Sequence, residues 1–361
     1  MNLQPKRIGA ACLLSLALGV ACEPPGSEML ANDQSAGARV DPAQPYSTDP
    51  FARASRRRES PYAIVVLPDT QYYAARYPAV FKAQTTWIVQ QRGARAIAFV
   101  VHEGDLVDTE DVAQWSVASD SMDILADARV PYVLSMGNHD YAVGPSGWPT
   151  GRSTMIDQFF PVARFSGNSW FYGTLDPAHI ENSYAVLEVP DTEAHWLVVS
   201  LEFGPRDAVV KWADEVLKRH SRLPAIVVTH AYLYDDGTRY DVVRRPDQKW
   251  NPHRYPIVTQ PGGVNDGEEI WQKLILPNPN VEFVLCGHVL GKGVARSTST
   301  RPDGTIVHEI LANYQTLPIG GGGYLRILTF FPDSRVVHVE TYSPYLAVSK
   351  TDGANDFYLP Y

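Results

Sequence analysis

The sequence predicts an α/β fold in which two packed β-sheets are flanked by helices. From residue 62 to about residue 137, apolar runs rich in β-branched residues alternate with stretches of helical periodicity. This alternation is typical of βαβ units and a largely parallel sheet. From residue 307 to residue 342, apolar runs follow one another with only short turns between them, which indicates a meander of strands. The mixture favours two sheets within one domain.

Each predicted element follows from its own pattern. The helix over 78–93 has Pro78 at its start and Gly93 at its end, where these residues are common. Further helices are expected over 111–128, 206–220 and 267–276. Strands are expected over 63–68, 96–102, 132–137, 183–189, 195–203, 225–230, 281–288, 307–313, 324–331 and 336–342. Two long segments rich in aromatic residues, Gly and Pro, 141–171 and 232–266, are loops of the kind that cover a site.

The first 22 residues have the pattern of an export signal. Lys6 and Arg7 precede an apolar run over 8–20 that is too short for a permanent membrane-spanning helix. Small residues ahead of Cys22 resemble a bacterial lipoprotein processing site, although Gly19 stands where leucine is usual. We expect an exported protein of the bacterial cell envelope or medium, which meets the membrane only through a lipid anchor on Cys22. Ordinary signal cleavage is the alternative.

Residues 23–60 are predicted to be a flexible linker, and residues 61–361 a globular catalytic domain. The linker is rich in Pro, Ala, Ser and Asp, and its arginines between 53 and 58 fit a solvated tether better than a headgroup-binding patch. Loss of residues 1–22, with two basic and no acidic residues, would take the net charge from −9 to −11. Such a charge argues against nonspecific nucleic-acid binding. Only Cys286 would remain in the domain, so no intrachain disulfide is expected.

Polar side chains follow five of the predicted strands, at the point where each strand ends. They are Asp69, Asp105, Asn138, His230 and His288. The carboxyl ends of parallel strands share one edge of a sheet, so these side chains can converge there. Each position alone could be a helix cap or a packed core residue. Their joint occurrence after apolar runs indicates a metal centre.

The ordered set resembles the calcineurin-like metallophosphoesterases. The motifs that carry the resemblance are Asp69-Thr70-Gln71, Gly104-Asp105-Leu106-Val107-Asp108, Gly137-Asn138-His139-Asp140, the strand-end His230, and Gly287-His288-Val289-Leu290. The stretch LPDTQYY is similar to a branch of exported bacterial members in which Gln replaces the histidine of the first motif. The resemblance implies a four-layer αββα sandwich, formed by two mixed β-sheets flanked by helices, with two divalent metals at the strand ends.

The resemblance also implies a ligand set. Asp105 would bridge two metals, and the first metal would also take Asn138, His230 and His288. The second would take Asp69, Gln71, Asp105 and the residue at position 290, which here is leucine. Leucine has no donor atom, and an amide oxygen binds zinc or iron more weakly than imidazole does. We therefore expect one tight site for Mn, Fe or Zn, and a second that is weak or empty and prefers a hard ion.

The implied activity is hydrolysis of phosphomonoesters or phosphodiesters by metal-bound hydroxide. His139 would be the general acid, and the Asp108 carboxylate would accept its other N–H. One alternative is a catalytically degenerate family member that acts as a surface binding protein, and another is a hydrolase of a different bond. His102 and Cys286 are expected to be packed core residues. The residues left outside the predicted site are Glu202, Arg206, His253, Asn313, Tyr314 and Gln315.

Overall fold

Two mixed β-sheets pack face to face in the protein. The structure, a computed structural model, describes residues 60–190 and 192–361. The predicted signal, Cys22 and the linker as far as residue 59 lie outside the described residues. The described residues belong to one compact unit of the chain, Arg57–Tyr361.

The first sheet joins a parallel part to an antiparallel part. Its strand order is β13-β12-β11-β1-β2-β3, with β14 paired to β12. β1, β2 and β3 are parallel, whereas β11 runs antiparallel to β1. The strands are β1 (Tyr62–Leu67), β2 (Ile97–His102), β3 (Tyr132–Leu134), β11 (Leu325–Phe331), β12 (Val336–Ser343), β13 (Val348–Lys350) and β14 (Phe357–Pro360).

The second sheet has the order β4-β5-β6-β7-β8-β10-β9. Its central strands β6, β7, β8 and β10 are parallel, and the strands at both edges are antiparallel. The strands are β4 (Phe171–Asp176), β5 (His179–Glu188), β6 (His195–Ser200), β7 (Ala225–Val228), β8 (Val281–Cys286), β9 (Val294–Thr300) and β10 (Ile306–Ala312).

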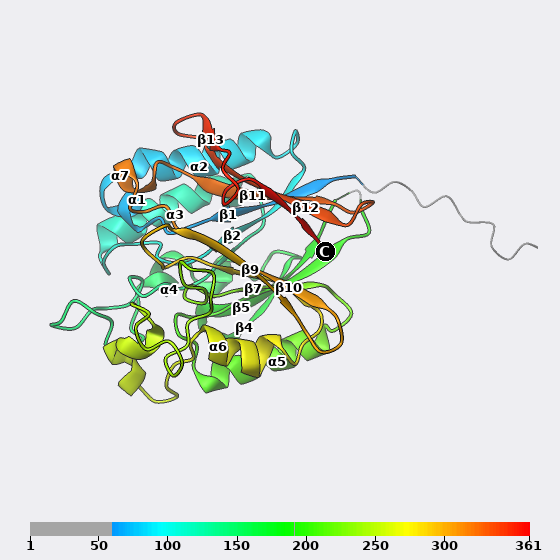
Figure 1. Ribbon diagram of the computed structural model, residues 1–361. Helices are drawn as coiled ribbons and strands as arrows, with labels where there is room; N and C mark the ends of the chain where they lie inside the picture. Colours follow the sequence, from blue (N-terminus) through cyan, green and yellow to red (C-terminus); the bar gives the residue numbers. More distant parts are fainter. Residues whose placement is uncertain (1–59, 191) are drawn as a thin grey trace, which may run out of the picture. The chain divides into compact units, whose positions relative to one another are not determined.

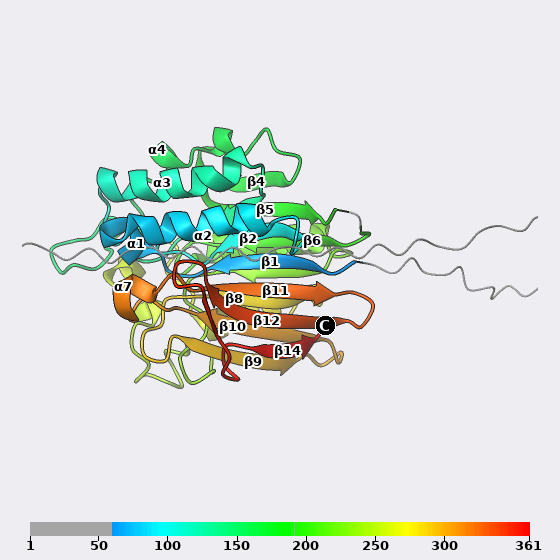
Figure 2. The same ribbon diagram turned by 90° about the horizontal axis from the view of Figure 1, so that it is seen from above.

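Helices cover the outer face of each sheet. Figure 1 shows α1, α2 and α3 above the first sheet and α5 and α6 below the second, which gives four layers, and Figure 2 shows the same unit from above. The helices are α1 (Gln71–Arg76), α2 (Pro78–Gln91), α3 (Val112–Asp127), α4 (Ile156–Phe159), α5 (Asp207–Arg219), α6 (Gly267–Ile270) and α7 (Pro318–Gly321). The predicted αββα sandwich is confirmed.

The space between the sheets is filled by apolar side chains. Phe99, Trp196, Phe283 and Phe330 lie in this inner core, and the rings of Trp196 and Phe330 are 5.1 Å apart. Aromatic pairs at such distances add to the free energy gained by burial. This rigid interior fixes where the strands end, and with them the side chains that follow. Within residues 60–190 and 192–361, no helix has the length and apolar run that a membrane crossing requires.

Candidate metal centre

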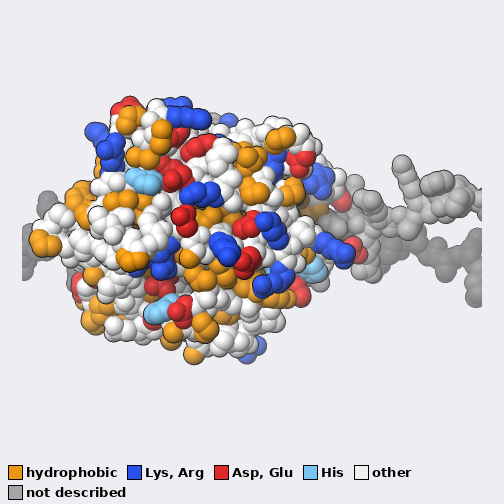
Figure 3. All heavy atoms as spheres, turned by 90° about the horizontal axis from the view of Figure 1, so that it is seen from below, with side chains coloured by type: hydrophobic (Ala, Val, Ile, Leu, Met, Phe, Trp, Pro, Cys, Tyr) orange, Lys and Arg blue, Asp and Glu red, His pale blue; other side chains and the backbone are white. Residues whose placement is uncertain are grey.

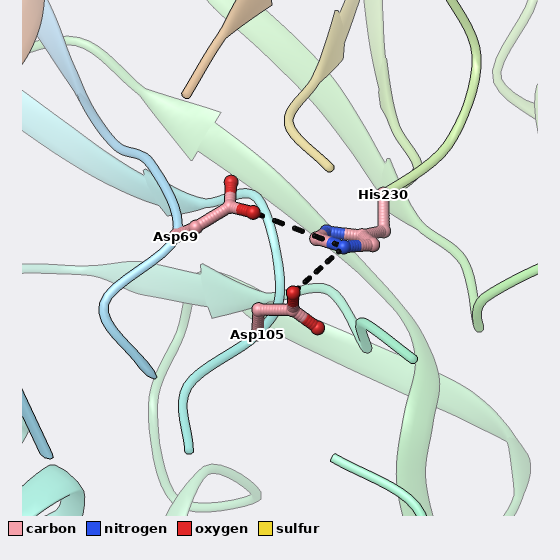
Figure 4. Close-up of side chains that lie close together, drawn as sticks. All are labelled: Asp69, Asp105 and His230. Atoms are coloured by element: carbon pink, nitrogen blue, oxygen red, sulfur yellow. Dashed lines mark ion pairs between the residues drawn. The ribbon is translucent and has the colours of Figure 1, made fainter. Parts of the chain in front are cut away.

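Three of the predicted ligands meet at the carboxyl ends of the strands. Asp69 follows β1, Asp105 follows β2 and His230 follows β7. One ligand atom of each lies within 4.8 Å of those of the other two, and all three residues are buried. Figure 4 shows the two carboxylates and the imidazole turned toward a common point. Both sheets therefore contribute to one cluster of donor atoms.

His230 is held with one ring nitrogen facing the carboxylates. Its Nδ1 lies 2.8 Å from the backbone oxygen of Glu103, and its Nε2 lies 3.3 Å from Asp105 Oδ2 and 4.0 Å from Asp69 Oδ2. A backbone acceptor on Nδ1 leaves the Nε2 lone pair for a metal, a common second contact of metal-binding histidines. Burial acts to lower the pKa of His230, but the carboxylates of Asp105 and Asp69 outweigh burial and raise it to about 9.

Asp69, which follows a strand of the first sheet, is held by donors that follow two strands of the second sheet. Its carboxylate accepts hydrogen bonds from the backbone N–H of His288 at 3.2 Å and from Asn313 Nδ2 at 2.9 Å. Burial raises the pKa of Asp69 to about 7, against the lowering effect of the His230 imidazole. Asn313, which follows β10 and was left outside the predicted site, thus orients a predicted ligand. Its position directly after a buried strand is the sequence signal that it shares with the ligands.

The backbone around Asp105 is unusually close and strained. Asp105 itself has a positive φ of 51°, which is rare for a residue with a side chain and is often found at functional sites. A Cβ on Gly137 would overlap the Asp105 carboxylate, and one on Gly104 would lie 2.7 Å from the Gly137 nitrogen. Both glycines are therefore needed for this packing. Burial acts to raise the pKa of Asp105, but the imidazoles of His230 and His139 hold it below its ordinary value.

The turn after β3 carries Asn138 and His139 to the cluster. The His139 backbone N–H donates to Asp105 Oδ1 at 3.0 Å, while the buried carboxylate of Asp140 accepts from the N–H groups of Gly137 and Val107. Asp140 thus shapes the turn from within. Asn138 is buried, and its Oδ1 has no hydrogen-bond partner in the described residues.

His288 lies beside His230, with ring centroids 4.9 Å apart. Its Nε2 contacts the backbone oxygen of Trp250 at 2.8 Å, so Nδ1 is the nitrogen left to bind a metal. Burial and the nearby His230 lower the pKa of His288 to about 3, which keeps the ring neutral as a ligand requires. Like Asp105, His288 has a positive φ, 72°. The Trp250 contact comes from the loop between β7 and α6, inside the segment 232–266 that we expected to cover a site, although no pattern singles out Trp250 itself.

The remaining two positions differ in what they offer. Gln71, the first residue of α1, is fully buried, and neither its Oε1 nor its Nε2 has a hydrogen-bond partner among the described residues. Leu290 follows β8 in a loop, is partly exposed, and supplies only hydrocarbon. An unpaired buried amide is uncommon in proteins and calls for a missing partner. Asp69, Asp105 and His230 carry the ligand atoms that lie together, and the unpaired amide oxygens of Gln71 and Asn138 are of a kind that divalent ions also accept.

His139 and Asp108 are also close, but through a different atom from the one expected. His139 Nδ1 lies 2.9 Å from the backbone oxygen of Asp108 and 3.7 Å from its carboxylate. The sequence predicted that the carboxylate would accept the N–H, and the backbone carbonyl takes that place. The His139 side chain is 34% exposed, which leaves it accessible from solvent.

Other candidates belong to separate networks. His253 Nε2 lies 2.6 Å from Glu269, which with Asp266 forms the capping box of α6. The buried Glu202 pairs with Arg206, the N-cap residue of α5, and with Arg152.

Both ring nitrogens of His102 are hydrogen bonded, to Thr70 Oγ1 and from the N–H of Gly104. Cys286 is fully buried in β8. Both are packed core residues, as expected.

Comparison with known proteins adds a family match. Residues 62–291 match the calcineurin-like phosphoesterase family. The uncharacterized protein YvnB of Bacillus subtilis (strain 168) is 32% identical over 292 residues, which are 79% of this chain and 20% of YvnB. The chain thus spans about a fifth of the length of this curated relative. A solved structure, "GAP50 the anchor in the inner membrane complex of Plasmodium", is similar with a TM-score of 0.40 and 10% identity over 82% of this chain and 89% of that one.

Proposed function

We propose that this chain, which belongs to the calcineurin-like phosphoesterase family, hydrolyses a phosphomonoester or phosphodiester at the strand-end cluster. Membership of the family indicates metal-dependent phosphoester hydrolysis with divalent ions. The observation that carries the proposal is the approach of Asp69, Asp105 and His230 within 4.8 Å of one another. Buried carboxylates and imidazoles either pair with one another or coordinate a cation, and the family match favours the cation here.

The residues divide into two groups by role. Asp105, Asn138, His230 and His288 would hold one divalent ion, and Asp69, Asp105 and Gln71 would face a second. Such an ion lowers the pKa of a bound water and offsets the charge on the phosphoryl oxygens. Every other part of the reaction falls to the chain's own side chains, which position the ester and move the proton.

His139 is the residue that would protonate the leaving oxygen. Its backbone N–H is hydrogen bonded to the proposed bridging Asp105, so the imidazole stands beside the ions without having to ligate them. A hydrogen bond from Nδ1 to the Asp108 carbonyl leaves Nε2 to carry the proton that is transferred. Partial exposure of the ring allows a substrate to reach it.

The two halves of the centre would differ in strength. The half with Asn138, His230 and His288 contains all its ligands, whereas the half with Gln71 and Leu290 lacks both imidazoles. We propose that the first half binds Mn, Fe or Zn tightly, and that the second binds a hard ion such as Mn or Mg weakly or stays empty. Export to the cell envelope with a lipid anchor on Cys22 stays a prediction, because those residues lie outside the described ones.

The test is hydrolysis of p-nitrophenyl phosphate and bis-p-nitrophenyl phosphate by purified protein with added Mn²⁺, Mg²⁺ or Zn²⁺. Asp105→Asn removes the proposed bridge with little change in volume and is the matched control. We expect activity in the parent chain and its loss in the variant. No hydrolysis with any ion would favour the alternative of a surface binding protein on the same fold. The observation that favours this alternative is Leu290, which has no donor atom at a position where the family has a metal ligand.

A further inference from the structure

A second group of metal-ligand side chains lies where α4 meets the start of β5. It consists of the carboxylates of Asp157 and Glu181 and the imidazole of His179. One ligand atom of each lies within 4.8 Å of those of the other two. None of the three residues belongs to the strand-end cluster. Figure 3 views the molecule from the side of the second sheet, where histidine and acidic side chains lie next to each other at the surface.

The three side chains converge because of how α4 and β5 are built. His179 and Glu181 are two residues apart on a strand, so their side chains project from the same face, while Ile180 between them is buried. Asp157 lies in the first turn of α4, and its Oδ1 accepts a hydrogen bond from the Ile180 backbone N–H at 3.1 Å. This bond holds α4 against the strand. The second carboxylate oxygen, Oδ2, lies 2.6 Å from His179 Nδ1.

The group is open to solvent through His179 and is mostly buried at Glu181. The exposed fraction of the side chain is 54% for His179, 25% for Asp157 and 13% for Glu181. An ion from solvent therefore has access to the donors past the imidazole. The Glu181 carboxylate accepts no hydrogen bond from another described residue. Its ion-pair contact among the described residues is the 3.9 Å approach of Oε2 to His179 Nδ1.

The charges of the group leave one carboxylate without a close cation. Asp157 and Glu181 are both acidic, and the one imidazole beside them is taken up by Asp157 at 2.6 Å. Burial and the Asp157 charge raise the pKa of Glu181 above its ordinary value. The raised pKa shows that a negative charge on both carboxylates is unfavourable here. A divalent ion between them would supply the missing positive charge.

The donor types favour zinc among the common divalent ions. One imidazole nitrogen with carboxylate oxygens is a ligand set of zinc sites in which three protein ligands leave a further position for water. Ca²⁺ takes about 6–8 oxygen ligands, and Mg²⁺ keeps most of its waters, so neither ion gains from the imidazole.

We propose that Asp157, His179 and Glu181 bind a zinc ion that ties α4 to β5. The site is separate from the strand-end cluster, so the proposal does not rest on the proposed hydrolysis.

The test is calorimetric titration of the chelator-treated full chain with Zn²⁺, with Ca²⁺ as the contrasting ion. All titrations are made in the Asp105→Asn chain, which lacks the proposed bridge, so that binding here is separated from binding at the strand-end cluster. His179→Ala and Glu181→Gln each remove one donor. His195→Ala is the matched control, because His195 is an exposed histidine at the start of β6. Thermal unfolding of each variant with and without Zn²⁺ is the second measurement.

We expect Zn²⁺ to bind the Asp105→Asn chain with a Kd of about 100 µM or tighter, and Ca²⁺ to bind at least about tenfold more weakly. Zn²⁺ binding should weaken at least about tenfold in His179→Ala and Glu181→Gln and be unchanged in His195→Ala. Zn²⁺ should also raise the Tm of the Asp105→Asn chain, because an ion held only by the folded state stabilises it, and this rise should be lost in both ligand variants.

Three results would overturn the proposal. The first is a Zn²⁺ affinity of the Asp105→Asn chain below this limit. The second is Zn²⁺ binding and a Tm rise that survive both ligand variants, since the ion would then be held elsewhere. The third is Ca²⁺ binding as tight as that of Zn²⁺. If His179→Ala does not fold, Glu181→Gln, which keeps the volume of the side chain, decides.

Discussion

The Nδ1 atom of His139 lies 2.9 Å from the backbone carbonyl oxygen of Asp108, closer than the 3.7 Å that separates it from the Asp108 carboxylate. A backbone acceptor cannot be removed by substitution of the side chain. The orientation of the proposed general acid therefore depends on the fold of the turn, and only secondarily on the charge of Asp108.

Because the contact is to the backbone carbonyl, substitutions of His139 and Asp108 should differ in their effect on kcat. His139→Ala should lower kcat by about 10²–10⁴-fold, the usual effect of losing an acid or base, with metal content kept. Asp108→Asn should lower kcat by less than about tenfold, because a partly exposed charge contact contributes about 0.2–1 kcal/mol. Steady-state kinetics with an activated and an unactivated phosphoester measures both. Equal losses in the two variants would show that the carboxylate, not the carbonyl, orients the ring.

Loss of metal is expected from a different pair of substitutions. His230→Ala and Asn138→Ala each remove a proposed ligand of the first half-site, so both proteins should purify with less metal than the parent. His195→Ala changes an exposed histidine at the start of β6 and is the control for loss of an imidazole. Elemental analysis of the purified proteins gives the metal content per chain. Unchanged content in both ligand variants would exclude these residues from the centre.

The glycine beside Asp105 should be intolerant of even one carbon. A Cβ at Gly137 would collide with the Asp105 carboxylate and backbone. Gly137→Ala should therefore displace Asp105, lower metal affinity and cost about 1–3 kcal/mol of unfolding free energy, as overpacked sites do. Gly93→Ala, where a Cβ meets nothing within 4 Å, is the matched control. Urea unfolding and metal titration measure both variants. If Gly137→Ala has the same unfolding free energy and metal affinity as Gly93→Ala, the site tolerates the added methyl group and the prediction is wrong.

One substitution would restore an imidazole to the half-site that we propose to be depleted. Leu290→His returns an imidazole to the position where the family pattern has one, next to Asp69 and Gln71 in the proposed second half. We expect the variant to hold more metal per chain than the parent after dialysis against buffer with trace Mn²⁺. Two tightly held ions in the unmodified protein would contradict the idea that Leu290 depletes this half.

A pH effect on stability is expected from Glu181, which lies in β5 beside Asp157. Burial and the Asp157 charge raise its pKa to about 7. A carboxyl whose pKa is higher in the folded state stabilises fully below its unfolded pKa, and this stabilisation is lost as pH rises through about 7. Between pH 5 and pH 8 the parent should therefore lose on the order of 2 kcal/mol of unfolding free energy that the Glu181→Gln variant keeps. Urea unfolding at both pH values, with the exposed Glu188→Gln as control, would show no such difference if Glu181 were solvated.

The sequence predicted the fold and the meeting of Asp69, Asp105 and His230 because strand ends are a local signal. Apolar runs mark the strands, and parallel pairing brings their ends to one edge. It missed β9, whose segment Val294–Thr300 is polar and lies at an edge of the second sheet, so no apolar run marks it.

The contacts of Asn313 and the Trp250 carbonyl with the centre were also missed. Trp250 lies in a long loop in which no pattern singles it out. Asn313 follows the buried strand β10, as the ligands follow theirs, but it was left outside the predicted site. The Asp108 carbonyl that contacts His139 was also missed. The sequence shows that an aspartate is present, but it does not show whether its backbone carbonyl or its carboxylate accepts the hydrogen bond.

We propose that the strand-end side chains hold a divalent ion without which phosphoester hydrolysis does not occur. The most direct measurement is the rate of bis-p-nitrophenyl phosphate and p-nitrophenyl phosphate hydrolysis by chelator-treated protein during stepwise addition of Mn²⁺. We predict negligible hydrolysis without metal, a rate that rises as the proposed first half-site fills, and no rise in Asp105→Asn. A chelated protein that hydrolyses either ester as fast as the reconstituted one, or an Asp105→Asn variant that recovers with it, would contradict the account.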